Sequence, residues 1–134
     1  MSTLLLFEEE SYAILGSCID IHKKIGAGFR ETVYHEVLEK ELSKRNIPFE
    51  KNKKLQLYYD GVALNKYASA DFVSFGKIII QIKSVNTIKH ETIQQTVNFL
   101  KATNFKLLLL VNFGEPRLKW KRLINTSIPF SDHP

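Results

Sequence analysis

The stretch KIIIQIKSV, residues 77–85, decides the fold of this chain. Its isoleucines at 78, 79, 80 and 82 predict a buried β-strand, because β-branched side chains pack well on a pleated surface. Gln81 and Lys83 interrupt the apolar run two positions apart, so their side chains point to the same face. The presence of an amide and an ammonium side chain at the end of a buried strand requires an explanation.

The preceding segment SADFVS, residues 69–74, is expected to pair with this strand in antiparallel orientation. Paired residues share a face only if their numbers add to an even number, which requires a loop of odd length. The expected loop is SFG, residues 74–76, with Gly76 in the left-handed conformation. A two-residue Phe75–Gly76 turn is disfavoured, because it demands a positive φ of Phe75.

In this register Val73 pairs with Lys77, and Asp71 pairs with Ile79. The core face then carries five side chains, those of Ala70, Phe72, Ile78, Ile80 and Ile82. The opposite face carries one polar cluster, formed by Asp71, Gln81 and Lys83.

The rest of the chain predicts helices over residues 8–25, 30–44 and 89–103, from apolar side chains at helical spacing. A hairpin over 55–67 is expected to turn at Asp60–Gly61, and strands are expected over 105–113 and 117–124. We therefore predict a single α/β domain over 1–134, in which helices flank a central mixed, mostly antiparallel sheet. Residues 125–134 are expected to form a loose tail.

The composition is that of a globular protein, with 134 residues, 44% hydrophobic and 25% charged, which argues against a largely disordered chain. The single Cys18 cannot form an internal disulfide and suits the cytoplasm. The opening run MSTLLLFEEE lacks a basic leader, and the longest apolar run is too short to span a bilayer, so no membrane association is expected. Lys and Arg outnumber Asp and Glu by 19 to 14, which gives mild support for an anionic partner.

An acidic residue on one strand, followed on the next by acid-x-Lys, resembles the core of PD-(D/E)xK nucleases. Here the corresponding residues are AD at 70–71 and QIK at 81–83. Upstream, GFRETVY at 28–34 resembles the signature of the GxxExxY proteins, a branch of that superfamily, with Gly28, Glu31 and Tyr34 in place.

Downstream, residues 95–114 resemble the helix and strand that close the domain of that branch. Gln95 matches a helical glutamine, and Phe99 stands where a tyrosine is usual. The resemblance extends from about Tyr12 to Ile124.

The resemblance implies phosphodiester hydrolysis with Mg²⁺ or Mn²⁺, which polarises the phosphate and lowers the pKa of the attacking water. Mg²⁺ prefers oxygen ligands and keeps several waters, so two or three protein oxygens suffice. Asp71 would be the central ligand, Glu31 would reach in from the second helix, and the carbonyl of Ile82 would add an oxygen. Lys83 would orient the water and stabilise charge on the phosphate, and Gln95 would hold the site or the scissile backbone.

Gln81 is the main departure from the family pattern, which has an acid at this position. Its carboxamide oxygen can still coordinate a metal, but the site loses one negative charge, so metal affinity and water activation are expected to fall. Glu91, one turn before Gln95, is a candidate for a relocated acid, although an exposed acid in a first helical turn is the plainer interpretation.

Several further residues have two interpretations. Lys119 and Lys121 share one face of the last strand and are candidates for contacting the phosphate backbone, or simply form a solvated face. Tyr34 is a candidate for substrate binding, although Tyr34 and Trp120 are more typical of core residues. His22, His35 and His90 lack the spacing of a zinc site and are interpreted as surface or packing residues, with substrate contact as the lesser alternative for His90.

Three functional hypotheses follow. The first is a metal-dependent nucleic-acid phosphodiesterase, acting on DNA more than on RNA. The second is a nucleic-acid-binding module without catalysis, for which Gln81 is the main argument. The third is a protein-interaction domain on the same scaffold, and the presence of Asp71, Lys83 and Glu31 counts against it.

Overall fold

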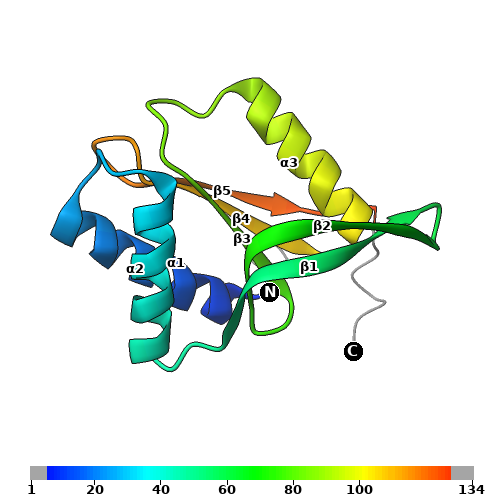
Figure 1. The fold of residues 1–134 in the computed structure, drawn as a ribbon, viewed down its shortest axis with the longest axis horizontal. Coiled ribbons are helices and arrows are strands. Elements are labelled where there is room, and N and C mark those ends of the chain that lie inside the picture. The colour runs from blue at the N-terminus through cyan, green and yellow to red at the C-terminus, as the bar shows by residue number, and fades with distance from the viewer. Residues whose placement is uncertain (1–5, 128–134) are drawn as a thin grey trace.

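The computed structural model describes residues 6–127, and Figure 1 shows their arrangement. Along the described chain the elements are α1 (Glu8–Ile25), α2 (Glu31–Lys44), β1 (Phe49–Tyr59), β2 (Val62–Ser74), β3 (Ile78–Lys83), α3 (His90–Thr103), β4 (Leu107–Asn112) and β5 (Lys119–Ile124). The three predicted helices are confirmed to within one residue at each end. None of the helices in this part of the chain is long and apolar enough to cross a membrane. The expectations about a leader at 1–5 and about a tail at 128–134 concern residues outside the described range.

The five strands form one sheet in the order β1-β2-β3-β4-β5. The β3–β4 pair is parallel and the other three pairs are antiparallel. A parallel pair needs a crossover connection, and α3 supplies it between β3 and β4. The predicted α/β fold with a mixed, mostly antiparallel sheet is therefore confirmed.

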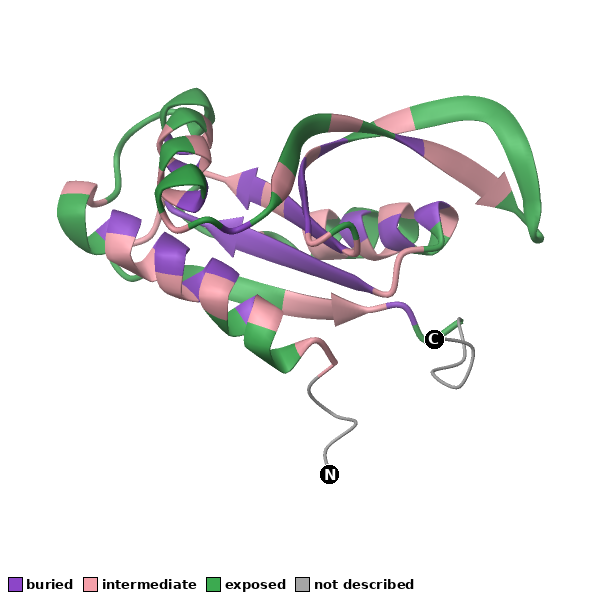
Figure 2. Ribbon diagram, turned by 90° about the horizontal axis from the view of Figure 1, so that it is seen from below, coloured by how far each residue is buried: buried purple, intermediate pink, exposed green. Residues whose placement is uncertain are grey.

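Helices cover the sheet on both faces, with α1 and α2 on one side and α3 on the other (Figure 1). The side chains of Ile78, Ile80 and Ile82 pack into the core beneath α1 and α2. Ile79 packs into the second core, beneath α3, together with Leu108 and Leu110. β4 is buried along its whole length, which explains its uninterrupted apolar run (Figure 2).

The turn between β2 and β3 differs from the prediction. The loop is Phe75–Gly76–Lys77, so the observed pairs are Val73 with Ile79 and Ser74 with Ile78, a shift of two residues. Phe75 does take a positive φ of 57°. Contacts from elsewhere offset this strain, because the N–H of Phe75 donates to the carbonyl of Pro48 at 3.1 Å and the ring packs against the first core. The loop length remains odd, so the predicted facing of the isoleucines is preserved.

Ala70 is a second correction. Strand alternation predicts it on the face of Phe72, but it packs in the core beneath α3, whereas Phe72 packs beneath α1 and α2. The normal alternation of faces therefore breaks at Asp71. In the β1–β2 register Lys51 pairs with Phe72 and Lys53 with Ala70, so Asn52 lies opposite Asp71. Asn52 has a positive φ of 48°, and this irregular backbone coincides with the break.

The hairpin at Asp60–Gly61 is confirmed, since both residues have positive φ and Tyr59 pairs with Val62. Its strands are longer than expected, because β2 is one continuous strand that pairs with β1 along one edge and with β3 along the other. The outer part of this hairpin is exposed, as Figure 2 shows.

The folded part of the chain continues past the predicted boundary at residue 124. Asn125 is buried, and its side-chain amide donates to the carbonyl of Phe105 at 3.0 Å. Its backbone N–H donates to the carbonyl of Lys106 at 2.9 Å. The expectation of a loose tail from residue 125 is therefore wrong for Asn125, because distant backbone groups hold it.

Candidate active site

The candidate site lies where β2 and β3 separate. Backbone pairing between these strands ends at Phe72 and Ile80, and the same register places Asp71 opposite Gln81. Beyond that point, side chains accept the hydrogen bonds of the backbone N–H groups. The N–H of Asp71 donates to Oε1 of Gln81 at 2.6 Å. The N–H of Ile82 donates to Oδ2 of Asp71 at 2.7 Å. Both N–H groups are thereby satisfied, and the carboxylate of Asp71 is held between the parting strands.

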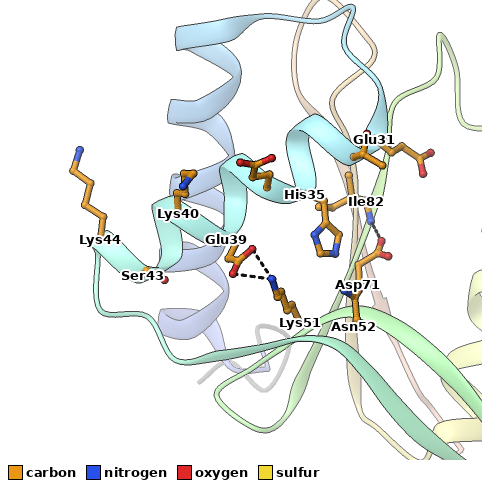
Figure 3. A pocket seen from close by; sticks show the side chains of 12 residues that line it. Glu31, His35, Glu39, Lys40, Ser43, Lys44, Lys51, Asn52, Asp71 and Ile82 are labelled. Atoms are coloured by element: carbon orange, nitrogen blue, oxygen red, sulfur yellow. Dashed lines mark hydrogen bonds and ion pairs between the residues drawn. The ribbon is translucent and has the colours of Figure 1, made fainter.

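Asp71 borders an open cleft of about 1060 Å³ between α2 and the sheet (Figure 3). Glu31, His35 and Glu39 follow one another at four-residue spacing, so they form one face of α2 along the cleft. The facing wall consists of Lys51 and Asn52 from β1, Asp71 from β2 and Ile82 from β3. The cleft therefore brings together three of the predicted site residues, namely Asp71, Glu31 and Ile82.

Tyr34 holds the segment that leads into Glu31. Its side chain is fully buried and stacks on Phe113 with ring centroids 4.5 Å apart. Its hydroxyl donates to the carbonyl of Gly26 at 2.5 Å and accepts the N–H of Phe29 at 3.4 Å. The suggestion that Tyr34 contacts substrate is therefore not supported by its position, because the ring is enclosed by the core; the alternative, core packing, describes it correctly.

Gln81 and Lys83 lie on the other side of the sheet from the cleft. Ile80 and Ile82 face α1 and α2, so the alternation of β3 directs Gln81 and Lys83 toward the side of α3. Gln81 remains connected to the cleft through its hydrogen bond with Asp71, but Lys83 does not line the cleft. Gln81 and Lys83 therefore face away from Ile78, Ile80 and Ile82, as predicted, but Asp71 borders the cleft on the isoleucine side, because the alternation of β2 breaks there. The prediction of one polar cluster of Asp71, Gln81 and Lys83 on a single face is wrong, and Lys83 does not share a pocket with Asp71 and Glu31.

Gln95 and Glu91 both lie on the exposed surface of α3 and do not line the cleft. Glu91 stands in the first turn of α3, as the plainer interpretation predicted. The helical glutamine of the family pattern is therefore on the opposite side of the sheet from Glu31.

Lys119 and Lys121 are exposed and share a face of β5. They pair with Asn112 and Leu110, and Leu110 faces α3, so both lysines lie on the α3 side. Lys83 pairs with Asn112 from the other side, which places Lys83 and Lys119 in one row across β4. Trp120 points to the opposite face and is 41% exposed beside α1, so the expectation that it belongs to the core is wrong. β5 is an edge strand, and α1 covers the face that carries Trp120 only in part.

Sequence reasoning missed His35 as a site residue. Its ring lines the cleft and stacks on Phe72, with centroids 4.4 Å apart and an interplanar angle of 27°. The sequence feature that could have identified His35 is its position four residues after Glu31, which puts both residues on one helix face. His22, by contrast, is a packing residue, because it stacks near Phe113 and its Nε2 lies 2.9 Å from the carbonyl of Glu115.

The donor set in the cleft suits a hard cation. Over residues 6–127 no three His, Cys, Asp or Glu side chains form a metal-binding group, so a closed zinc-type site is absent from that part of the chain. Four acids line the cleft. Of these, Glu39 is paired with Lys51 and Glu36 lies on α2, and the other two, Asp71 and Glu31, are the predicted ligands. Mg²⁺ is commonly bound through one or two carboxylates with several waters, and Mn²⁺ accepts similar ligands, so these residues fit either ion.

Comparisons with known proteins agree with this fold. A family model described as the PD-(D/E)XK nuclease superfamily matches residues 8–123. The crystal structure of SSO0001 has a similar fold, with a TM-score of 0.51 and 22% sequence identity over 69% of this chain and 50% of that one. The chain thus spans about half the length of that structure, and the likeness shows the fold alone. No curated protein matches the chain.

Proposed function

Because the chain belongs to the PD-(D/E)XK nuclease superfamily, we propose that it is a metal-dependent nucleic-acid phosphodiesterase, acting on DNA in preference to RNA. The observation that carries this proposal is the position of Asp71, whose carboxylate stands between the parting strands and borders the same cleft as Glu31. Gly28, Glu31 and Tyr34 further support placing the chain in the GxxExxY branch of the superfamily.

In this proposal Asp71 and Glu31 hold the cation, with the carbonyl of Ile82 as a further ligand. The ion, when bound, polarises the phosphate and lowers the pKa of the attacking water. The hydrogen bond from the N–H of Ile82 fixes Oδ2 of Asp71, so the carboxylate is oriented before any ligand arrives. Tyr34 contributes by holding the segment before Glu31 in place.

The nucleic acid is proposed to lie across the polar end of the sheet. Asp71 and Glu31 border the α2 side, whereas Lys83, Lys119 and Lys121 lie on the α3 side. In this arrangement Lys83 stabilises phosphate charge from the end of β3, and the two lysines of β5 contact the nucleic-acid backbone farther along. Gln95, on the exposed surface of α3, would contact the same strand of the nucleic acid.

A second candidate function is nucleic-acid binding without cleavage, and Gln81 is the observation that favours it. Its amide brings no charge, and its Oε1 already accepts the N–H of Asp71. The cation would then rest on two carboxylates, which lowers its affinity relative to a site with three.

Melting curves with and without Mn²⁺, combined with a plasmid-nicking assay, separate these functions. A ligand that binds only the folded state raises stability by mass action, so a metal site predicts a higher Tm in Mn²⁺. Asp71→Ala should abolish both the Tm shift and the nicking. Salt-sensitive DNA binding with neither a Tm shift nor nicking would establish the second candidate. If the protein shows no Tm shift, no nicking and no nucleic-acid binding, the proposal is overturned. A protein-interaction domain is then the remaining hypothesis.

A further inference from the structure

His35 lines the cleft and carries an unexplained buried polar atom. Its Nε2 is buried and has no hydrogen-bond partner over residues 6–127. The ring extends from α2 toward β1 and β2, near Lys51 and Asp71 in Figure 3. Stacking on Phe72, the residue that follows Asp71, fixes the plane of the ring. The ring is therefore held in a set orientation in the wall of the cleft that Asp71 also lines.

A packing role alone does not account for this arrangement. A buried polar atom without a partner costs stability, whereas a phenyl ring would stack on Phe72 at no such cost. His22 shows what a histidine in a structural role looks like in this protein, since it also stacks on a phenylalanine but its Nε2 has a backbone partner. Buried polar atoms left unpaired in a folded protein point to a bound water, ion or ligand.

The cleft is lined by both acidic and basic side chains. Glu39 is already neutralised by Lys51, with an Nζ–carboxylate distance of 3.0 Å. Beyond His35 the cleft is also lined by Lys40 and Lys44, which make no ion pair over residues 6–127. Glu36 also lines the cleft, so an anionic group near the Asp71–Glu31 end would meet acidic as well as basic side chains, and its cationic partners there would be Lys40 and Lys44.

We propose that His35 is a substrate-positioning residue, whose Nε2 forms a hydrogen bond, directly or through one water, with a phosphate oxygen of the nucleic acid. This inference rests on the proposed function. It assigns to α2 a second role beside carrying Glu31, namely orienting the phosphate backbone along the cleft. Phe72 acts as the platform that holds the imidazole in position.

The test compares His35→Phe with His22→Phe. His35→Phe keeps the stacking and removes the unpaired nitrogen, so its Tm should equal or exceed that of the wild type. The Kd for a DNA oligonucleotide in EDTA should rise, and kcat/KM for cleavage in Mn²⁺ should fall, each on the order of tenfold, the size expected of one hydrogen bond to a charged group. His22→Phe should instead lower the Tm and leave binding and cleavage by the folded protein unchanged.

A spectroscopic measurement on the wild type covers the case in which His35→Phe does not fold. The ring ¹⁵N resonances of His35 should shift when the same oligonucleotide is added in EDTA, while those of His22 should not. Unchanged binding and cleavage in folded His35→Phe, or unmoved His35 resonances on saturation, would overturn this inference while the proposed function stands. A wild type that neither binds nor cleaves the oligonucleotide would overturn both.

Discussion

The backbone N–H of Asp71 donates to the side-chain oxygen of Gln81 across the gap between β2 and β3, at 2.6 Å. The residue that departs from the family pattern is therefore bonded to the residue that carries the proposed site. A glutamate at 81 could accept the same hydrogen bond, since its carboxylate is nearly isosteric with the amide. The polar end of β3 thus has the geometry of an acidic ligand position without its charge.

Gln81→Glu should strengthen metal binding. The added carboxylate repels the charges of Asp71 and Glu31 when no cation is present, so the variant should melt slightly below the wild type in EDTA. In Mn²⁺ its increase in Tm should exceed that of the wild type, because a third anion raises affinity for the folded state. Adding Asp71→Ala to the variant should remove the increase. Equal shifts in wild type and Gln81→Glu would show that residue 81 does not act on a bound cation.

Asp71→Asn should separate the structural role of this residue from its charge. The amide oxygen can still accept the N–H of Ile82, so the Tm in EDTA should change little. The Mn²⁺-induced shift should disappear, and plasmid nicking should fall by roughly a hundredfold or more, in line with the several kcal/mol that a metal ion contributes. Nicking at the wild-type rate would exclude Asp71 as a ligand.

Charge reversal of Lys119 and Lys121 together should weaken DNA binding without unfolding the protein, since both side chains are exposed. The Kd should rise and the slope of log Kd against log salt should become shallower, by about one for each phosphate that the variant no longer neutralises. Lys23→Glu with Lys24→Glu, at the exposed end of α1, makes the same change in net charge and serves as the control. Similar effects of the two double variants would mean that only net charge matters.

Gly114→Ala should disturb the segment after β3. A Cβ at Gly114 would lie 2.4 Å from both the N and the O of Val85, and these atoms are held in place by hydrogen bonds with Asn112. We expect a loss of about 1–3 kcal/mol in the free energy of unfolding by urea. Gly16→Ala in α1 meets no atom within 4 Å and should gain about 0.5–1 kcal/mol. A neutral Gly114→Ala would show that this segment can move aside.

Ionisation of the Cys18 thiol should make the stability of the protein depend on pH. Burial raises the pKa of its thiol to about 12, whereas the thiol of an unfolded chain has an ordinary pKa of about 8.5. Above that pH the unfolded chain loses a proton that the folded protein keeps, so stability should fall by up to about 1.4 kcal/mol per pH unit until the folded thiol ionises. Cys18→Ala should be less stable at neutral pH but should lack this part of the slope, as urea unfolding between neutral pH and about pH 10 would measure.

The alternating pattern of residues 78–83 determined which side chains of β3 face which core. Any loop with an odd number of residues gives the same assignment of side chains to the two faces of the sheet. The face on which Ile78, Ile80 and Ile82 lie therefore did not depend on which three-residue loop forms. The register itself depended on contacts that no local pattern contains. The N–H of Phe75 and the hydroxyl of Ser74 both donate to the carbonyl of Pro48, and these bonds help to hold a left-handed phenylalanine in the turn.

The same division applies to the site. Asp71 and Glu31 were identifiable from the sequence, because the resemblance to the nuclease core and the motif around Glu31 are properties of neighbouring residues, but strand alternation predicted the wrong face for Asp71. Alternation along β3 correctly predicted the face of Lys83, whereas tertiary structure decided that Asp71 borders the cleft on the opposite face, that Tyr34 is enclosed and that His35 borders the cleft. Helical spacing specifies which residues share a face of α2, but the packing of α2 on the sheet decides whether that face is covered or open, and that packing involves residues distant in the chain.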